Sequence, residues 1–129
     1  MIDSQTLEVI NILLDVEELL TDAVWVQGVL ALNAEGYPTD ERDHTVQVCA
    51  LGGLRYCVDT RHETDKEHNW GVITADAVNA VLQQAYDLSR ETIPADETLL
   101  TEWNDDSERT AADVRALFRQ AALAKARGE

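Results

Sequence analysis

Apolar residues recur at helical spacing in four separate stretches of this 129-residue chain, and this periodicity restricts its fold more than any other feature. A spacing of three or four residues places apolar side chains on one face of an α-helix, where they can be buried. We expect a first helix over about residues 5–20, with Ser4 as its N-cap. A last helix should follow Thr110, which approximates a capping box with Asp113.

The two middle helices are expected on either side of a polar stretch. One should follow the charged segment PTDERDH, with Asp43 or Thr45 as its cap, and carry its apolar stripe from Val46 to Cys57. The next segment, DTRHETDKEHNWG, is polar and reads as a loop. Thr74 should cap the third helix, which continues to Leu88.

The remaining segments predict a small β-hairpin and an irregular connection. Trp25–Leu32 is rich in β-branched and aromatic residues, and NAEGYP supplies turn residues before a short return strand near Tyr37. One helical turn is expected at residues 98–102. With aromatic residues at only 5%, aliphatic side chains and alanine must fill the core. We therefore expect a mainly α protein with a small β-hairpin (α+β), about four helices around one core, in a single domain over residues 1–129.

The chain is strongly acidic, with a formal net charge of −15 at pH 7. Residues 1–48 hold ten acids and one base, for a net charge of −9. Residues 49–106 hold twelve acids and four bases, for −8, and residues 107–129 hold three acids and five bases, for +2. Such a body repels phosphate backbones and anionic lipid, because no basic face can release counterions. Direct binding to nucleic acid is therefore disfavoured.

Neither an export signal nor a membrane span is evident. The start, MIDSQTLEVI, lacks a basic segment followed by an apolar run, and the longest uncharged stretch, Ala23–Ala34, is too short to cross a bilayer. A cytoplasmic location is expected, with both cysteines reduced. On one helix, Cys49 and Cys57 would also lie about 12 Å apart, too far for a disulfide.

The segment VQVCALGGLRYC, which holds both cysteines, has a structural and a catalytic interpretation. Cysteine behaves as a small hydrophobe, and the two glycines cost about 1 kcal/mol each in a helix. We therefore expect a helix face that a neighbour approaches closely at Gly53, with Trp25 or Trp103 as the bulky partner. In the catalytic alternative, Cys49 near the start of the helix is a nucleophile with a lowered pKa.

A cysteine enzyme also needs a base and a group that orients the base. The chain order Gln27, Cys49, His62 or His68, Asn104 matches the order of oxyanion donor, nucleophile, base and orienting residue in papain-like enzymes. The local Cys-Gly-Ser-Cys-Trp signature of those enzymes is absent. Cys49, His62 and Asn104 are thus the catalytic candidates, and the structural interpretation is the stronger one.

A polar patch late in the chain, EWNDDSERT, offers a second candidate site. Its residues Asn104, Asp105 and Arg109 could surround a small-ligand pocket together with Trp25 and Gln27. The alternative is structural, with Trp103 as an anchor and Asn104 or Asp105 accepting N–H groups near the next helix start. Capping is the favoured interpretation.

Motifs for a metal or cofactor are missing. Cys57, His62 and His68 lie among acidic residues, but no Cys-x-x-Cys, His-Glu-x-x-His or calcium-loop spacing is present. CALGGL lacks the lysine and the preceding strand of a phosphate-binding loop. We expect no metal site and no cofactor, and a metal-binding or small-ligand protein is the third-ranked function.

Several short motifs together resemble a known family. They occur in the order Trp25, Gln27-Gly28, Ala31, Gly36, CALGGL, WND at Trp103–Asp105, Arg109-Thr110, Asp113-Val114 and Ala121. This set is similar to a family of small uncharacterised proteins from actinobacteria, other bacteria and their phages, classed as a domain of unknown function. The resemblance covers Trp25 to about Ala122, excludes the stretch between Cys57 and Trp103, and implies a compact intracellular protein of bacterial or phage type.

The favoured function is a non-enzymatic binding or regulatory protein whose negative surface engages a basic protein partner. It could act as a nucleic-acid decoy or as an inhibitor of a host factor. The acidity could equally serve solubility alone. A cysteine-dependent enzyme using Cys49 is the runner-up, and the oligomeric state is left open.

Overall fold

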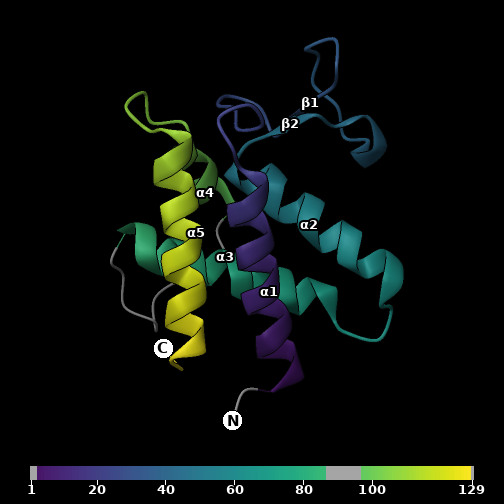
Figure 1. Cartoon of the computed structure of the whole chain (residues 1–129), viewed down its shortest axis with the longest axis vertical. Helices are drawn as coiled ribbons and strands as arrows, with labels where there is room; N and C mark the ends of the chain where they lie inside the picture. The colour runs from purple at the N-terminus through teal and green to yellow at the C-terminus, as the bar shows by residue number, and fades with distance from the viewer. Residues whose placement is uncertain (1–2, 87–96, 129) are drawn as a thin grey trace.

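The computed structural model describes residues 3–86 and 97–128, and this part of the chain is mainly helical (Figure 1). The helices are α1 (Ser4–Leu19), α2 (Ala50–Thr64), α3 (Trp70–Tyr86), α4 (Glu97–Asn104) and α5 (Ala111–Ala126), and the strands are β1 (Ala31–Leu32) and β2 (Gln47–Val48). The predicted mainly α fold is confirmed, and its small β element is the two-stranded antiparallel sheet of β1 and β2. The described residues contain five α-helices rather than four, because the helical turn expected at 98–102 is the complete helix α4.

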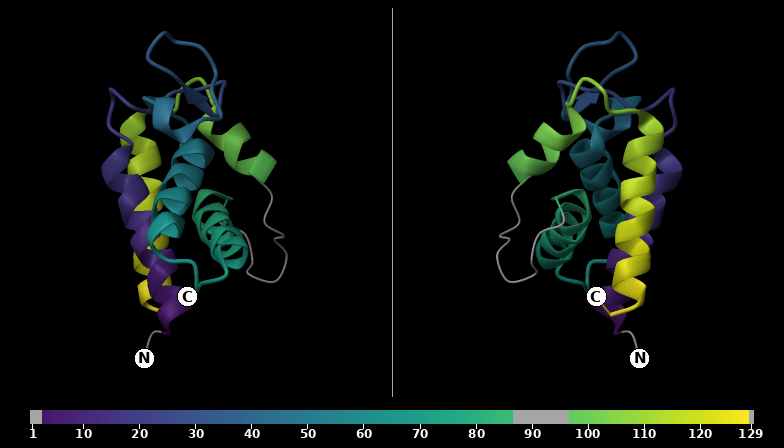
Figure 2. Two further views of the ribbon diagram at one scale, coloured as in Figure 1. Left: turned by 90° about the vertical axis from the view of Figure 1, so that its right-hand side faces the viewer. Right: turned by 90° about the vertical axis from the view of Figure 1, so that its left-hand side faces the viewer.

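Helices α1 and α5 lie side by side and run in opposite directions, so that α1 begins and α5 ends at the same end of the molecule (Figure 1). Helix α3 crosses this pair and contacts both, and α2 packs on α1 and α3. The β-hairpin and the α4–α5 loop are both at the other end of the molecule (Figure 2). Buried aliphatic side chains from all five helices form one core, with Phe118 its largest fully buried member.

Local signals explain where the outer helices start. Asp3, rather than the predicted Ser4, caps α1 by accepting a hydrogen bond from the Thr6 N–H at 2.7 Å. The predicted capping box of α5 is confirmed, because Thr110 and Asp113 each accept the backbone N–H of the other. The helix expected to reach Leu88 is described to Tyr86, and Leu88 lies outside the described residues.

The predicted strand Trp25–Leu32 is wrong over most of its length. Only Ala31–Leu32 is extended in a sheet, and its antiparallel partner is Gln47–Val48 rather than the segment near Tyr37. That segment contributes a single antiparallel bridge, between Leu32 and Pro38, and Trp25 a single parallel bridge to Val48. Gly28 has a φ of +84°, which interrupts extended geometry. Tertiary contacts of residues 25–30 override their β propensity.

Helix α2 starts later and ends later than predicted. Val46 precedes β2 and is 48% exposed, so it is not part of the helical stripe, and Cys49 is the N-cap rather than a residue of the first turns. The helix continues to Thr64 through the segment predicted as a loop. Arg61 holds this polar end against α1 by hydrogen bonds to Asp15 at 2.8 Å and to Glu8 at 3.2 Å.

Helix α3 starts at Trp70, one turn before the predicted cap Thr74. The Thr74 hydroxyl donates to the carbonyl oxygen of Trp70, so Thr74 lies inside the helix. The side chain that accepts an N–H of the first turn is Asn69, which binds Val72 N–H at 3.1 Å. The Trp70 indole donates to the backbone of Asp65 and joins the start of α3 to the end of α2.

The prediction that Gly53 faces a close-packed neighbour is confirmed, but the neighbour is aliphatic. A Cβ atom on Gly53 would lie 3.2 Å from a methyl of Leu20 and 3.3 Å from a methyl of Val48. The predicted tryptophans are not among its nearest neighbours. Gly52 is tighter still, because the backbone of Leu30 rests directly on it.

Candidate functional site

Asn104, the last residue of α4, is the one buried polar side chain in the described part of the chain, with 0% exposure. An asparagine amide can accept two hydrogen bonds and donate two. Its Oδ1 accepts from the Trp25 indole at 2.6 Å and from the Ala50 N–H at 3.0 Å. Its Nδ2 donates to the Val26 carbonyl at 3.1 Å and to an Asp105 carboxylate oxygen at 3.0 Å. The capacity of Asn104 is therefore filled by the protein itself.

The other predicted polar residues surround this amide. Gln27 donates to the backbone oxygens of Asn104 and Asp106, and Asp105 accepts the Gly28 N–H at 2.9 Å. The Arg109 guanidinium lies 3.7 Å from the centre of the Trp103 ring, and its Nε donates to the Trp103 carbonyl. The structure thus brings together all five predicted ligand-binding candidates, Trp25, Gln27, Asn104, Asp105 and Arg109.

We call the group Trp25, Gln27, Asn104, Asp105 and Arg109 the polar clasp. It joins three segments that are far apart in the sequence. Asn104 caps the start of α2 through Ala50, whereas the favoured interpretation expected a cap on the helix that follows it. Helix α5 is capped by Thr110 instead. The Asn104 amide already has four protein partners and so has no hydrogen-bonding capacity left for a ligand. The role of the clasp is therefore to stabilise the junction of the 25–28 segment, α2 and the α4–α5 loop.

Cys49 lies beside the clasp at the start of α2. Its side chain is 2% exposed, its Sγ accepts the Gly52 N–H at 3.3 Å, and its own N–H donates to the Leu30 carbonyl. A helix N-terminus favours a thiolate, but removal from water opposes it. Burial prevails here and raises the pKa of the Cys49 thiol.

The predicted catalytic residues are not assembled around Cys49. His62 is thirteen residues further along α2, which at 1.5 Å per residue is about 20 Å away, and its ring lies 6.3 Å from that of Trp70. His44 and His68 pair with Glu41 and Asp65. Asn104 does contact this region, but its amide is saturated by other partners.

Both thiols should be unreactive in the folded protein. Burial raises the pKa of Cys57 to about 12, with a smaller contribution from the Asp15 carboxylate. Since only the thiolate is alkylated, iodoacetamide at pH 8 should label neither cysteine at a measurable rate until the chain is unfolded in urea, when both should react like free cysteine. Mass spectrometry after timed quenching measures both rates. Rapid native labelling of Cys49 alone would revive the nucleophile interpretation.

Metal ligands do not converge either. Within residues 3–86 and 97–128, no group of three or more histidine, cysteine, aspartate or glutamate side chains is placed to hold an ion. The histidine-bearing segment at 58–68 instead completes α2 and its connection to α3.

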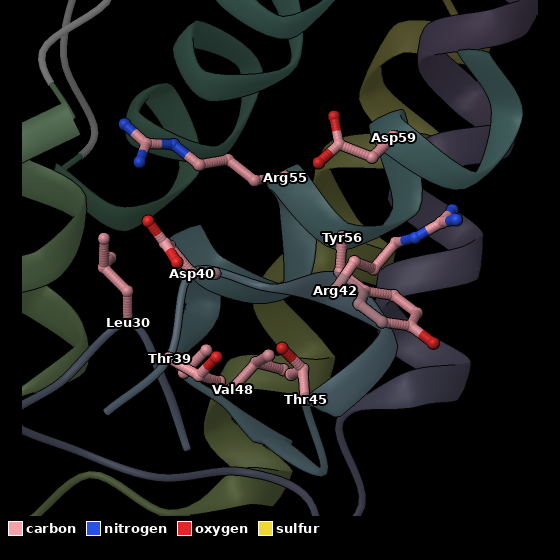
Figure 3. Close-up of a pocket in the computed structure, with 11 residues that line it drawn as sticks. Leu30, Thr39, Asp40, Arg42, Thr45, Val48, Arg55, Tyr56 and Asp59 are labelled. Atoms are coloured by element: carbon pink, nitrogen blue, oxygen red, sulfur yellow. The ribbon is translucent and has the colours of Figure 1, made fainter. Parts of the chain in front are cut away.

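A groove of about 260 Å³ lies between the β-hairpin segment and α2 (Figure 3). We call it the hairpin–α2 groove, and its lining residues are Leu30, Ala31, Thr39, Asp40, Arg42, Thr45, Val48, Gly52, Arg55, Tyr56 and Asp59. Of its polar residues only Asp59 was considered from the sequence, as one of the acidic residues around Cys57 and His62. The other sequence signal was the charged segment PTDERDH, which contains Thr39, Asp40 and Arg42 and was interpreted as a loop.

Comparison with known proteins places the chain in a family. Residues 4–124 match DUF6197, a family of unknown function. The chain belongs to this family. The match covers the clasp, the groove and every helix almost completely, so the family extends over the 58–102 stretch that the resemblance in sequence motifs left out.

Neither the search of curated proteins nor the search of solved structures found a match to the chain. In the described residues, every helix is too short or too polar to cross a bilayer.

Proposed function

We propose that this DUF6197 protein is a non-enzymatic binding protein whose acidic surface engages a basic protein partner. The observation that carries the proposal is the imbalance of charge after all internal ion pairs are formed. Thirteen of the twenty-one carboxylate side chains in the described residues have no arginine or lysine within salt-bridge distance. Five of the thirteen have other partners, since Glu41 and Asp65 pair with histidines and Asp3, Asp105 and Asp113 accept N–H groups of the protein; the other eight are available to an external cation.

Most of the arginine and lysine side chains, in contrast, form ion pairs with carboxylates of the same chain. At least six of the nine arginine and lysine residues in the described ranges have a carboxylate partner. The pairs are Arg42–Glu63, Arg55–Glu97, Arg61 with Glu8 and Asp15, Arg109–Asp106, Arg119–Glu17 and Lys125–Asp76. A surface of this kind attracts cationic proteins over several ångströms and repels polyanions. Direct nucleic-acid binding is correspondingly disfavoured.

The resemblance to bacterial and phage proteins supports a bacterial or phage origin. The enzyme alternative is weaker on chemical grounds. Its nucleophile is buried with a raised pKa, and its base lies on a distant turn of the same helix.

Affinity chromatography tests the proposal. The immobilised protein should retain a basic protein from a bacterial lysate at 50 mM NaCl and release it between about 0.2 and 0.5 M, because the screening length falls from about 10 Å at 0.1 M towards 3 Å at 1 M. An unrelated protein of the same net charge is the control. If nothing elutes with salt, or if the control retains the same proteins equally, the acidity serves solubility and the proposal fails.

A further inference from the structure

We propose that the hairpin–α2 groove receives one arginine side chain of the basic partner, with Asp40 and Asp59 as its charge partners. This inference rests on the proposed function and assigns it a specific place. Asp40 comes from the segment between β1 and β2 and Asp59 from α2, so two carboxylates from separate elements line the groove (Figure 3).

The two arginines that line the groove are already neutralised from outside it. Arg55 donates two hydrogen bonds to one carboxylate oxygen of Glu97 on α4, at 3.1 and 2.8 Å. Arg42 is held by Glu63 and by the Thr60 hydroxyl, both on α2. Neither guanidinium is bonded to Asp40 or Asp59, so the groove keeps its negative charge.

Asp40 and Asp59 themselves have no ion-pair partner in the described part of the chain, and both side chains are exposed. Two unpaired carboxylates that line one groove favour a planar cation with several donors. Guanidinium is such a group, because its five N–H donors can bond to more than one carboxylate at once.

The size and the apolar lining of the groove fit the stem of the same side chain. A volume of about 260 Å³ is many times that of a water molecule, about 30 Å³, and lies below the usual range of drug-sized pockets, which starts at about 300 Å³. Leu30, Val48 and the Tyr56 ring provide apolar contact for methylene groups, and an aromatic ring also attracts a guanidinium.

A second, more open hollow continues from the groove along α2 and shares Arg42 and Asp59 with it. It adds the carboxylates of Glu41, Asp43 and Glu63. Asp43 and Glu63 pair with Arg42, and Glu41 pairs with His44, so Asp40 and Asp59 are the unpaired carboxylates of the two hollows.

The test uses the whole protein and an acetylated, amidated Arg-Gly-Arg peptide, followed by amide chemical shifts in 20 mM NaCl. The largest shifts should fall on groove residues such as Thr39, Tyr56 and Asp59. The double variant Asp40→Asn/Asp59→Asn should raise the Kd at least fivefold. The same peptide with citrulline in place of arginine has the same shape without the charge and should not bind.

A matched variant separates the groove from acidity in general. Asp22→Asn/Glu108→Gln removes the same charge from two exposed side chains that do not line the groove, and it should change the Kd less than twofold. Thermal melts establish that both variants fold, and Asp59→Asn alone provides a milder change on the exposed face of α2.

Three results would overturn the assignment to the groove. They are an equal loss of affinity in the two double variants, shifts spread over the whole acidic surface, and no shift at millimolar peptide. None of these results contradicts the proposed function of binding a basic protein. That proposal is contradicted only if the chromatography finds no salt-released partner specific to this protein.

Discussion

Gly52→Ala should lower the free energy of unfolding by about 3 kcal/mol, or prevent folding altogether. A Cβ atom there would lie 2.9 Å from the Leu30 carbonyl carbon and closer still to its oxygen, well inside any normal contact. The loop cannot simply move away, because the Leu30 carbonyl also accepts the Cys49 N–H at 3.1 Å. Alanine improves helix propensity by about 1 kcal/mol, which only partly offsets the clash.

Gly53→Ala is the matched control, since it makes the same change one residue later in the same helix. Its Cβ would meet the ends of the Leu20 and Val48 side chains at 3.2 and 3.3 Å, and side-chain methyl groups can turn aside where a backbone carbonyl cannot. We expect a change within about 1 kcal/mol, as the gain in helix propensity opposes the tight contact. Urea unfolding at 25 °C measures both variants, and equal stability of the two would contradict the close approach of Leu30.

Asn104→Leu should be similarly severe, with a loss of about 3–5 kcal/mol in the free energy of unfolding. Leucine has nearly the same shape but leaves the Trp25 indole, the Ala50 N–H and the Val26 carbonyl without this partner. Each buried polar group left unsatisfied costs about 1–3 kcal/mol, and water can reach part of this junction. Denaturant unfolding measures the loss, and the indole N–H resonance of Trp25 should shift.

Two further substitutions separate the hydrogen bonds from the packing. Asn104→Asp keeps the acceptor for Trp25 but places a carboxylate against the Val26 carbonyl and Asp105, so it should destabilise nearly as much as leucine. Asp105→Asn keeps an acceptor for the Gly28 N–H and should cost less than about 1 kcal/mol. If Asn104→Leu were as stable as Asp105→Asn, the clasp would not be the structural element described above.

The helices were predictable wherever a local rule was sufficient. The apolar stripe of α1 and the capping box of α5 depend on residues three or four apart, and both occur as predicted apart from a shift of the α1 cap by one residue to Asp3. The β propensity of Trp25–Leu32, in contrast, gave a wrong prediction, because most of this segment is not a strand. Its partners, Asp105 for the Gly28 N–H and Cys49 at the start of α2 for the Leu30 carbonyl, are distant in the sequence and determine the path of its backbone.

The candidate sites were likewise predictable only in part. Trp25, Gln27, Asn104, Asp105 and Arg109 could be selected as a group because EWNDDSERT is a distinctive polar patch beside a tryptophan, to which Trp25 and Gln27 were added. Their saturation by one another could not be foreseen, because it depends on distances across nearly eighty residues. The groove could not be predicted from the sequence, since Asp40 and Asp59 look like any other charged residues of an exposed segment.

By itself, then, the sequence determined the helical class, the charge, the capping of the last helix and the need for close packing at Gly53. Each of these depends on composition or on neighbours within one helical turn. Only the tertiary structure decided that Cys49 is the N-cap of α2, that the hydrogen bonds of the Asn104 amide are all made within the protein and that two carboxylates lining one groove remain unpaired. Burial and hydrogen-bond partners are set by segments that meet only in the folded chain, so no local pattern can encode them.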